Sequence, residues 1–154
     1  MGLDRIDHRI LASLQNNARL SNKELAGMVG LAPSSCLARV RRLTSSGALR
    51  SFRATLDPAA IGVGLQAVVS VQLHSHSTAS FVSFEQQVLE LNEVVAVYNL
   101  AGADDFLVHV AVRGPGHLHD FVMECITSRG EVRRVETNLI FEYHSRPMPI
   151  YTSE

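Results

Sequence analysis

The sequence contains few cysteines and no long apolar run, and both shortages narrow the class of protein. Its 154 residues include only two cysteines, Cys36 and Cys125. Two thiols form one bridge at most, whereas small secreted domains use more, so we expect both to be free. No apolar stretch approaches the roughly 20 residues of a membrane-spanning helix. Residues 1–16 alternate charged and apolar side chains, unlike a signal peptide. These features predict a soluble protein, cytoplasmic in a bacterium or archaeon, with no membrane partner.

Motifs that would indicate an enzyme are also missing. The sequence has no nucleophile elbow, no phosphate-binding loop and no helical His-Glu-x-x-His. The turn Gly114-Pro115-Gly116 lacks the lysine and the spacing of a phosphate loop, and Asp104-Asp105 is too local for an acid–base pair. The seven histidines are scattered, and their spacing does not show that they converge on a metal. We therefore predict no catalytic residue, no metal site and no cofactor.

What the sequence does contain is a globular composition with an uneven distribution of charge. Hydrophobic residues make up 46%, enough for a packed core, and the net charge is −1. Residues 1–58 carry nine Lys/Arg against four Asp/Glu, whereas residues 59–154 carry five against eleven. Chance clustering of solvated charges is one explanation. The other, which we favour, is that only the first part of the chain contacts a polyanion such as DNA.

Three short helices are predicted in the first third of the chain. Residues 4–15 place apolar side chains on one helix face and begin with Asp4 and Asp7, which the helix dipole favours in a first turn. Ser21 and Glu24 form a capping box for a second helix, which ends at Gly30. Pro33 suits the first position of a third helix, which Gly47 closes.

The third predicted helix has the composition of a DNA-recognition helix. Over residues 34–43, one side gathers Cys36, Leu37, Val40 and Leu43. The other side carries Ser34, Ser35, Ala38, Arg39, Arg41 and Arg42. Two short helices joined by a tight turn, the second rich in arginine, are typical of a helix-turn-helix. Small residues at its start allow a close approach to base edges, so Ser34 and Ser35 are predicted to contact bases or phosphates.

The arginines of this helix are predicted to divide the work of contacting DNA. Arg42 is expected to project from the centre of the polar face and to bind guanine through two hydrogen bonds. Arg39 and Arg41 flank it and suit phosphates, whose contacts position the protein without reading sequence. The alternative is a plain three-helix bundle whose arginines only solvate its surface.

The remaining two-thirds of the chain predict an α+β fold. Residues 49–56 alternate as in a half-buried strand, and Asp57-Pro58 breaks it. Strands are then expected at residues 65–73, 94–100, 106–112 and 132–143, with helices between the first two and between the last two. This βαββαβ order is ferredoxin-like, with an antiparallel sheet covered by helices on one face. The predicted domains are a helix-turn-helix at 1–47, a strand-containing linker at 48–64 and an assembly and effector domain at 65–154.

Taken together, the two halves resemble the Lrp/AsnC (feast/famine) family of transcription regulators over nearly the whole chain. The resemblance rests on Leu3-Asp4-Arg5-Ile6-Asp7, Gly30-Leu31-Ala32-Pro33, and Cys36-Leu37-Ala38-Arg39-Val40-Arg41-Arg42-Leu43 followed by Gly47. It implies that Ser34, Ser35, Arg39 and Arg42 face DNA. It also implies that the strand around Phe52 pairs with its copy in a dimer.

The same resemblance implies a small-molecule effector, usually an amino acid, bound in the C-terminal domain at interfaces between dimers. In the family, a Gly-x-x-Asp turn followed by a hydrophobic residue contributes to that site, and here it is Gly102-Ala103-Asp104-Asp105-Phe106. Asp104 stands where relatives commonly have an aromatic residue. The effector contacts implied by the resemblance are Leu100, Gly102, Asp104, Asp105 and Thr137.

The function predicted is a sequence-specific, DNA-binding transcription regulator of the nucleoid, whose assembly and DNA affinity respond to an amino acid or related metabolite. A homodimer is expected, because the uncovered sheet face can pack against the sheet of a second copy. This dimer is expected to assemble further into a tetramer or octamer and to bind double-stranded DNA. Two alternatives stay open: a winged-helix regulator responding to a metal or another small molecule, and an amino-acid-binding regulatory subunit of an enzyme.

Overall fold

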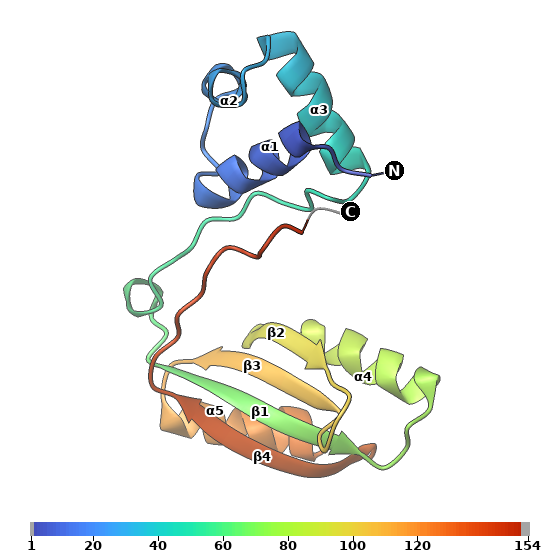
Figure 1. Ribbon diagram of the computed structural model, residues 1–154. Coiled ribbons are helices and arrows are strands. Elements are labelled where there is room, and N and C mark those ends of the chain that lie inside the picture. Colours follow the sequence, from blue (N-terminus) through green and yellow to red (C-terminus); the bar gives the residue numbers. More distant parts are fainter. Residues whose placement is uncertain (1, 152–154) are drawn as a thin grey trace. The chain divides into compact units, whose positions relative to one another are not determined.

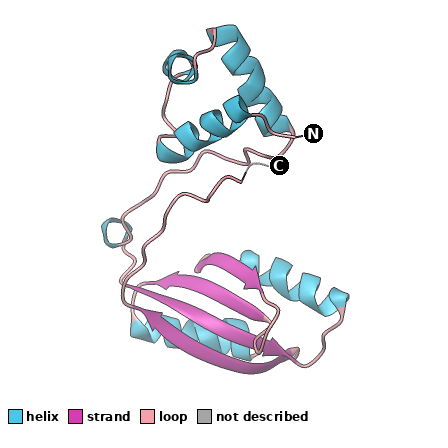
Figure 2. Cartoon of the chain, viewed as in Figure 1, coloured by secondary structure: helices cyan, strands magenta, loops and turns pink. Residues whose placement is uncertain are grey.

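The computed structural model describes residues 2–151 and separates the chain into two compact units. The first unit contains the residues up to Thr55 together with those from His144 onward, and the second is Leu56–Tyr143. The first unit is helical, and the second combines a sheet with helices (Figures 1 and 2).

The first unit is built on three helices: α1 (Arg5–Asn16), α2 (Asn22–Val29) and α3 (Pro33–Ser45). Their buried faces form one core, which consists of Ile10, Leu11, Leu14, Leu25, Ala26, Val29, Cys36 and Leu43. Only three residues separate α2 from α3, so α3 sits on α2 as in a helix-turn-helix. The three predicted helices are confirmed.

The helix ends explain why these boundaries could be predicted. Asp4 is the N-cap of α1, and its carboxylate accepts hydrogen bonds from the backbone N–H groups of Ile6 and Asp7. Ser21 and Glu24 form the predicted reciprocal capping box at α2. Gly30 ends α2 with φ of 74°, a left-handed conformation that glycine adopts without steric cost.

The C-terminal tail belongs to the first unit and not to the second. Ile150 is partly buried against the helical core, next to Leu3 and Leu49. Residues 144–154 were predicted to lie in the C-terminal domain, whereas the contacts of residues 144–151 assign that stretch to the first unit; residues 152–154 lie outside the described residues. The tail has no helical or alternating pattern of its own, and an apolar side chain in such a tail gives no indication of which core it will join.

The strand predicted at residues 49–56 is not formed. Residues 51–57 have no regular secondary structure, and Phe52 and Leu56 are exposed by 54% and 61%. A strand requires a hydrogen-bonded neighbour, and no described residue pairs with this segment. A short 3₁₀ helix, η1 (Ala59–Ile61), follows after Pro58.

The second unit is a four-stranded antiparallel sheet with helices packed on one face (Figures 1 and 2). Its strands are β1 (Leu65–Leu73), β2 (Val94–Asn99), β3 (Phe106–Val112) and β4 (Val132–Ile140), in the spatial order β2-β3-β1-β4. The helix α4 (Thr78–Leu89) joins β1 to β2, and α5 (Pro115–Phe121) continues as the π-helical segment η2 (Val122–Thr127) before β4. The predicted βαββαβ fold is confirmed.

Register decides which side chains reach the core. Val69 of β1 lies opposite Val108 of β3, and both point toward Phe84 and Phe121 on the helices. The intervening residues, such as Val68, Ser70 and His109, point to the other face, which no helix of the unit covers. No helix in the described part of the chain is long and apolar enough to cross a membrane.

Candidate functional site

The outward face of α3 begins with small residues, as the sequence predicts. Ser34, Ser35 and Ala38 are exposed, while Cys36 and Leu43 are completely or almost completely buried against α1 and α2. Leu37 differs from the prediction, which placed it on the apolar side, because its side chain is 38% exposed. Arg41 is exposed and forms no hydrogen bond or ion pair with any described residue.

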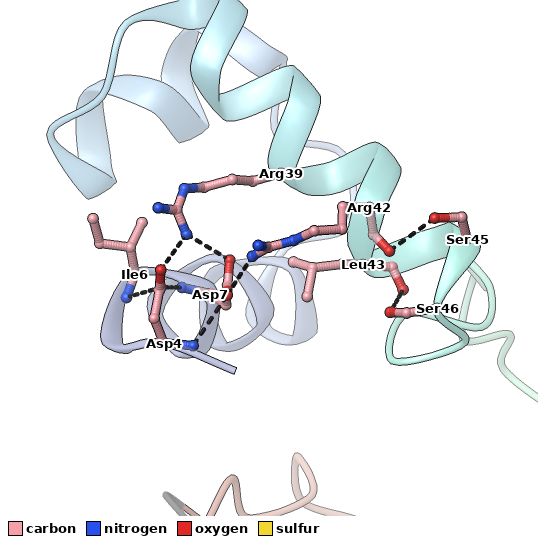
Figure 3. A network of polar contacts seen from close by, with 8 residues as sticks. All are labelled: Asp4, Ile6, Asp7, Arg39, Arg42, Leu43, Ser45 and Ser46. Atoms are coloured by element: carbon pink, nitrogen blue, oxygen red, sulfur yellow. Dashed lines mark hydrogen bonds and ion pairs between the residues drawn. The ribbon is translucent and has the colours of Figure 1, made fainter. Parts of the chain in front are cut away.

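The other two arginines of α3 are held by the start of α1 (Figure 3). Arg39 Nη1 donates to Asp4 Oδ2 at 2.6 Å and to Asp7 Oδ1 at 2.9 Å. Arg42 Nη2 donates to the second oxygen of Asp7, at 2.5 Å. The side chain of Asp7 is only 1% exposed. Both of its oxygens are therefore occupied by arginine, and Oδ2 also accepts from the backbone N–H of Asp4.

These pairs explain the electrostatics of the helix junction. The hydrogen bond from Arg39, reinforced by the backbone N–H of Asp7, lowers the pKa of Asp4 to about 2. The carboxylates of Asp4 and Asp7, which accept from Arg39, raise the pKa of its guanidinium. A buried carboxylate such as that of Asp7 is stable only when it is paired and hydrogen-bonded. Asp7 thus fixes the two arginines as much as they fix Asp7.

The position predicted for Arg42 is corrected by this network. Arg42 was expected to project freely from the centre of the polar face, but its guanidinium bends back to Asp7 and its side chain is 40% exposed. Asp4 and Asp7 were predicted only to be favoured by the helix dipole, not to bind arginine. Two acidic residues spaced by three at a helix start, in a chain with arginines spaced by three on α3, were the signal of a pairing between the helices.

The predicted effector turn lies between β2 and β3, and both carboxylate oxygens of its Asp105 contact other groups of the chain. Asp105 is buried, and Leu73 N–H donates to its Oδ2 at 2.7 Å. Its other oxygen lies 3.2 Å from His76 Nε2. Its backbone closes the turn by accepting from the N–H of Leu100 and donating to the carbonyl of Val71. Asp105 therefore joins the turn to the end of β1.

The other predicted effector residues are more accessible but are not all brought together. Gly102 is exposed, and Asp104 is half-buried beside Gln72 Nε2, at 3.3 Å. Thr137 is exposed on β4 opposite Val69 of β1. Because β1 lies between β3 and β4, Thr137 is separated by a strand from the turn that contains Gly102 and Asp104.

A pocket of about 290 Å³ adjoins this turn and was not predicted. It is lined by His76, Thr78, Phe81, Val82, Glu85 and Asn99. His76 connects it to the turn through Asp105. It offers a carboxylate, an imidazole, the N-terminal turn of α4 and an apolar wall, and its residues come from separate elements, so no local sequence motif marks it. Among the described residues, no three His, Cys, Asp or Glu side chains form a group that could hold a metal ion.

Comparison with protein families decides what these two units are. Residues 3–44 match the model of the AsnC-type helix-turn-helix domain, and residues 66–150 match that of the Lrp/AsnC ligand binding domain. The chain belongs to the Lrp/AsnC family. The first match lies within the helical unit, and the second covers most of the sheet unit and continues into the C-terminal tail. Both confirm the resemblance stated above.

Relatives within the Lrp/AsnC family extend over most of the chain. It is 45% identical over 148 residues to the HTH-type transcriptional regulator AldR of Mycobacterium tuberculosis, covering 96% of this chain and 83% of AldR. It is 36% identical over 137 residues to the leucine-responsive regulatory protein of Rhizobium meliloti, covering 89% of this chain and 88% of the relative.

Solved structures of the family show the same fold. The crystal structure of AldR from M. tuberculosis matches with a TM-score of 0.79 and 41% identity, over 96% of this chain and all of that one. A transcriptional regulator of Neisseria meningitidis, solved in complex with L-Met, matches with a TM-score of 0.86 and 30% identity, over 96% of both chains. The protein is accordingly a DNA-binding transcription regulator with a ligand-binding domain, and its relatives are regulators, not enzymes.

Proposed function

We propose that this regulator binds double-stranded DNA as a homodimer that presents two α3 helices to successive major grooves, and that an amino acid alters this binding. The observation that carries the proposal is the exposed face of α3, which has small polar residues at its start and an unpaired Arg41 farther along. A pair of such helices reads half-sites about one helical turn of DNA apart. The regulator would act in the cytoplasm, at the nucleoid.

The arginines of α3 divide into two groups in this proposal. Ser34 and Ser35 approach base edges or phosphates at the start of the helix, and Arg41 is free to reach a base. Arg39 and Arg42 each use one nitrogen on the aspartates of α1 and keep other N–H groups for phosphates. Such contacts would position the protein rather than read sequence.

Dimerisation is proposed to use the sheet face that no helix covers and the extended segment around Phe52. The sheet face carries Gln66, Val68, Ser70, Leu107, His109 and Ala111, which are all partly or fully buried between their neighbours and largely uncharged. Residues 51–56 leave their backbone groups without partners among the described residues, and a second copy of the segment would supply them. Assembly to a tetramer or octamer would then follow from further contacts between dimers.

The effector is proposed to bind where the turn at residues 100–105 meets the pocket beside His76. A free amino acid carries a carboxylate and an ammonium group. Glu85 suits the ammonium, while His76 and the first turn of α4 suit the carboxylate. Asp104, Gly102 and Leu100 lie on the turn, with Thr137 contributing only through a neighbouring subunit. The solved N. meningitidis relative with L-Met supports an amino acid as the class of ligand.

The test combines DNA binding with ligand binding on the purified full chain. Binding to a genomic fragment library in the presence of competitor DNA would identify specific sites, and a panel of the twenty amino acids would then be added singly. Saturable binding that changes with one amino acid supports both parts. Failure to select any DNA sequence would refute DNA recognition.

The two halves of the effector site can be separated by matched variants. Glu85→Gln should weaken binding of the active amino acid in calorimetry by at least tenfold, because one charge-assisted contact is lost. Asp104→Asn tests the turn in the same way. Leu89→Ala, on the exposed side of the same helix, is the control. If Glu85→Gln and Asp104→Asn both bind the amino acid with wild-type affinity, the ligand binds elsewhere.

A further inference from the structure

One apolar side chain stands out on the face of α3 that carries Ser34 and Arg41. Leu37 is 38% exposed, although it lies between a buried cysteine and an alanine. Residues 34, 37, 38 and 41 are spaced by three and four, so they form one continuous strip along the helix. The strip therefore reads serine, leucine, alanine, arginine, with its apolar part in the middle.

Because the ion pairs with α1 hold Arg39 and Arg42 to one side, this strip is the part of α3 that we expect to face base edges. Arg39 and Arg42 lie on the side of the helix that faces α1, where Asp4 and Asp7 hold them. Leu37, Ala38 and Arg41 are exposed and form no polar contact with any described residue. The apolar centre of the strip needs an apolar partner, and DNA has one in the major groove: the C5-methyl group of thymine.

Resting on the DNA binding proposed above, we infer that Leu37, with Ala38 beside it, reads thymine methyl groups in each half-site. Arg41, four residues after Leu37, lies one turn farther along the same strip and makes the adjacent polar contact. Discrimination at these positions is thus by shape and burial of a methyl group, not by a hydrogen bond. Leu37 is thus a specificity-determining residue, although the arginines of α3 are the more obvious candidates in the sequence.

The experiment removes only the methyl group from the DNA. In an operator obtained by selection, each thymine is replaced singly by deoxyuridine, which keeps every hydrogen-bonding group and lacks the C5-methyl. Affinity of the wild-type chain should fall about fourfold at one or two positions in each half-site, as expected for one methyl group no longer buried. The other thymines serve as internal controls.

The protein variants then test which side chain is responsible. Leu37→Ala should bind the selected operator more weakly and should bind thymine and uracil equally at those positions. Leu37→Gln keeps the length of the side chain and should lose the discrimination as well, so a defect in packing would not explain both. Leu89→Ala, at a more exposed leucine of the second unit, should keep the preference for thymine over uracil. Thermal unfolding of each variant confirms that it is folded.

The outcomes are distinct. Specific binding that is indifferent to every thymine-to-uracil change would overturn the inference while leaving the proposed function intact. So would a Leu37→Ala variant that still prefers thymine by the wild-type factor. If no DNA sequence is selected at all, the proposed function fails, and the role of Leu37 fails with it.

Discussion

Asp7 of α1 accepts a hydrogen bond from Arg42 of α3 at 2.5 Å, across 35 residues of sequence. Since Asp7 also binds Arg39 with its other oxygen, the first turn of α1 is connected to the recognition helix at two points. The orientation of α3 on its unit is thus set by an ion-pair network as well as by the apolar core. We therefore expect the network to influence DNA affinity through the position of α3, in addition to the phosphate contacts proposed for the remaining N–H groups of Arg39 and Arg42.

Replacing Asp7 should destabilise the first unit. In Asp7→Ala, the guanidinium of Arg42 loses its partner, Arg39 keeps only Asp4, and the backbone N–H of Asp4 loses its acceptor. Because both arginines can still reach water, we expect a loss of about 2 kcal/mol in the free energy of unfolding, less than for a fully buried pair. Urea unfolding followed by circular dichroism at 222 nm measures it. Asp120→Ala, an exposed carboxylate on α5, should change stability by less than about 0.5 kcal/mol.

If Asp7→Ala is as stable as the wild type, the network does not contribute to the stability of the first unit. Binding to the selected operator gives an independent measurement on the same variant. We expect weaker binding, because Arg42 is released and only the pair of Arg39 with Asp4 still connects α3 to the start of α1. A variant that binds DNA as tightly as the wild type would show that helix orientation does not depend on this pairing.

The course of the backbone could be predicted from the sequence because it depends on local signals. Ser21, Glu24 and Gly30 marked the second helix through capping, and the alternation in residues 65–73 marked β1, whose bounds agree with the prediction. Residues 49–56 carried a similar alternation but form no strand, because alternation cannot supply the hydrogen-bonding neighbour.

The candidate sites were harder to predict because they depend on distant pairings. The partners of Arg42 and Asp105 are 35 and 32 residues away in the sequence. The matched spacing of two aspartates and two arginines is the one sequence signal of the first pairing, and no sequence pattern indicates the second. An arginine on a polar helix face and an aspartate in a turn both look available in the sequence, and only the fold shows that other side chains or backbone groups already occupy them.

Asp105 should act first on the stability of the sheet. Asp105→Ala leaves the buried N–H of Leu73 without an acceptor, which costs about 1–3 kcal/mol. Asp105→Asn retains an oxygen for that N–H and should cost clearly less. Thermal unfolding of both variants, with Asp104→Ala as the half-exposed neighbour, measures the difference. Equal loss in the alanine and asparagine variants would assign the effect to the charge and to His76 rather than to the hydrogen bond.

The C-terminal tail should stabilise the helical unit. Ile150 packs on the core beside Leu3 and Leu49, so Ile150→Ala should lower the free energy of unfolding by about 1 kcal/mol, a fraction of the value for full burial. Met148, which is 78% exposed in the same tail, is the matched control. Hydrogen exchange followed by mass spectrometry should show faster exchange in α1 of the Ile150 variant. Equal protection in both variants would show that the tail does not support the helices.

His109 should make the second unit sensitive to mild acid. It lies on the sheet face that no helix covers, with Nε2 2.9 Å from Gln66 Oε1 and its ring 6.0 Å from that of Tyr143. Burial lowers the pKa of His109 below its ordinary value of 6.5. The unfolded chain therefore binds a proton more readily than the folded one, so the stability contributed by neutral His109 is complete above pH 6.5 and is lost as the pH falls through the folded pKa. The unfolding temperature of the wild type should decrease from pH 7.5 to pH 5, and His109→Gln should reduce that decrease.

The exposed His119 of α5 provides the matched control for this pH dependence. His119→Gln should leave the slope of unfolding temperature against pH unchanged, because this side chain is exposed to solvent in the folded chain as well as in the unfolded one. Asp4 does not affect the comparison, since its lowered pKa confines its contribution to a window below its ordinary value of 3.8. A His109→Gln variant with the wild-type slope between pH 7.5 and pH 5 would show that another group carries the acid sensitivity.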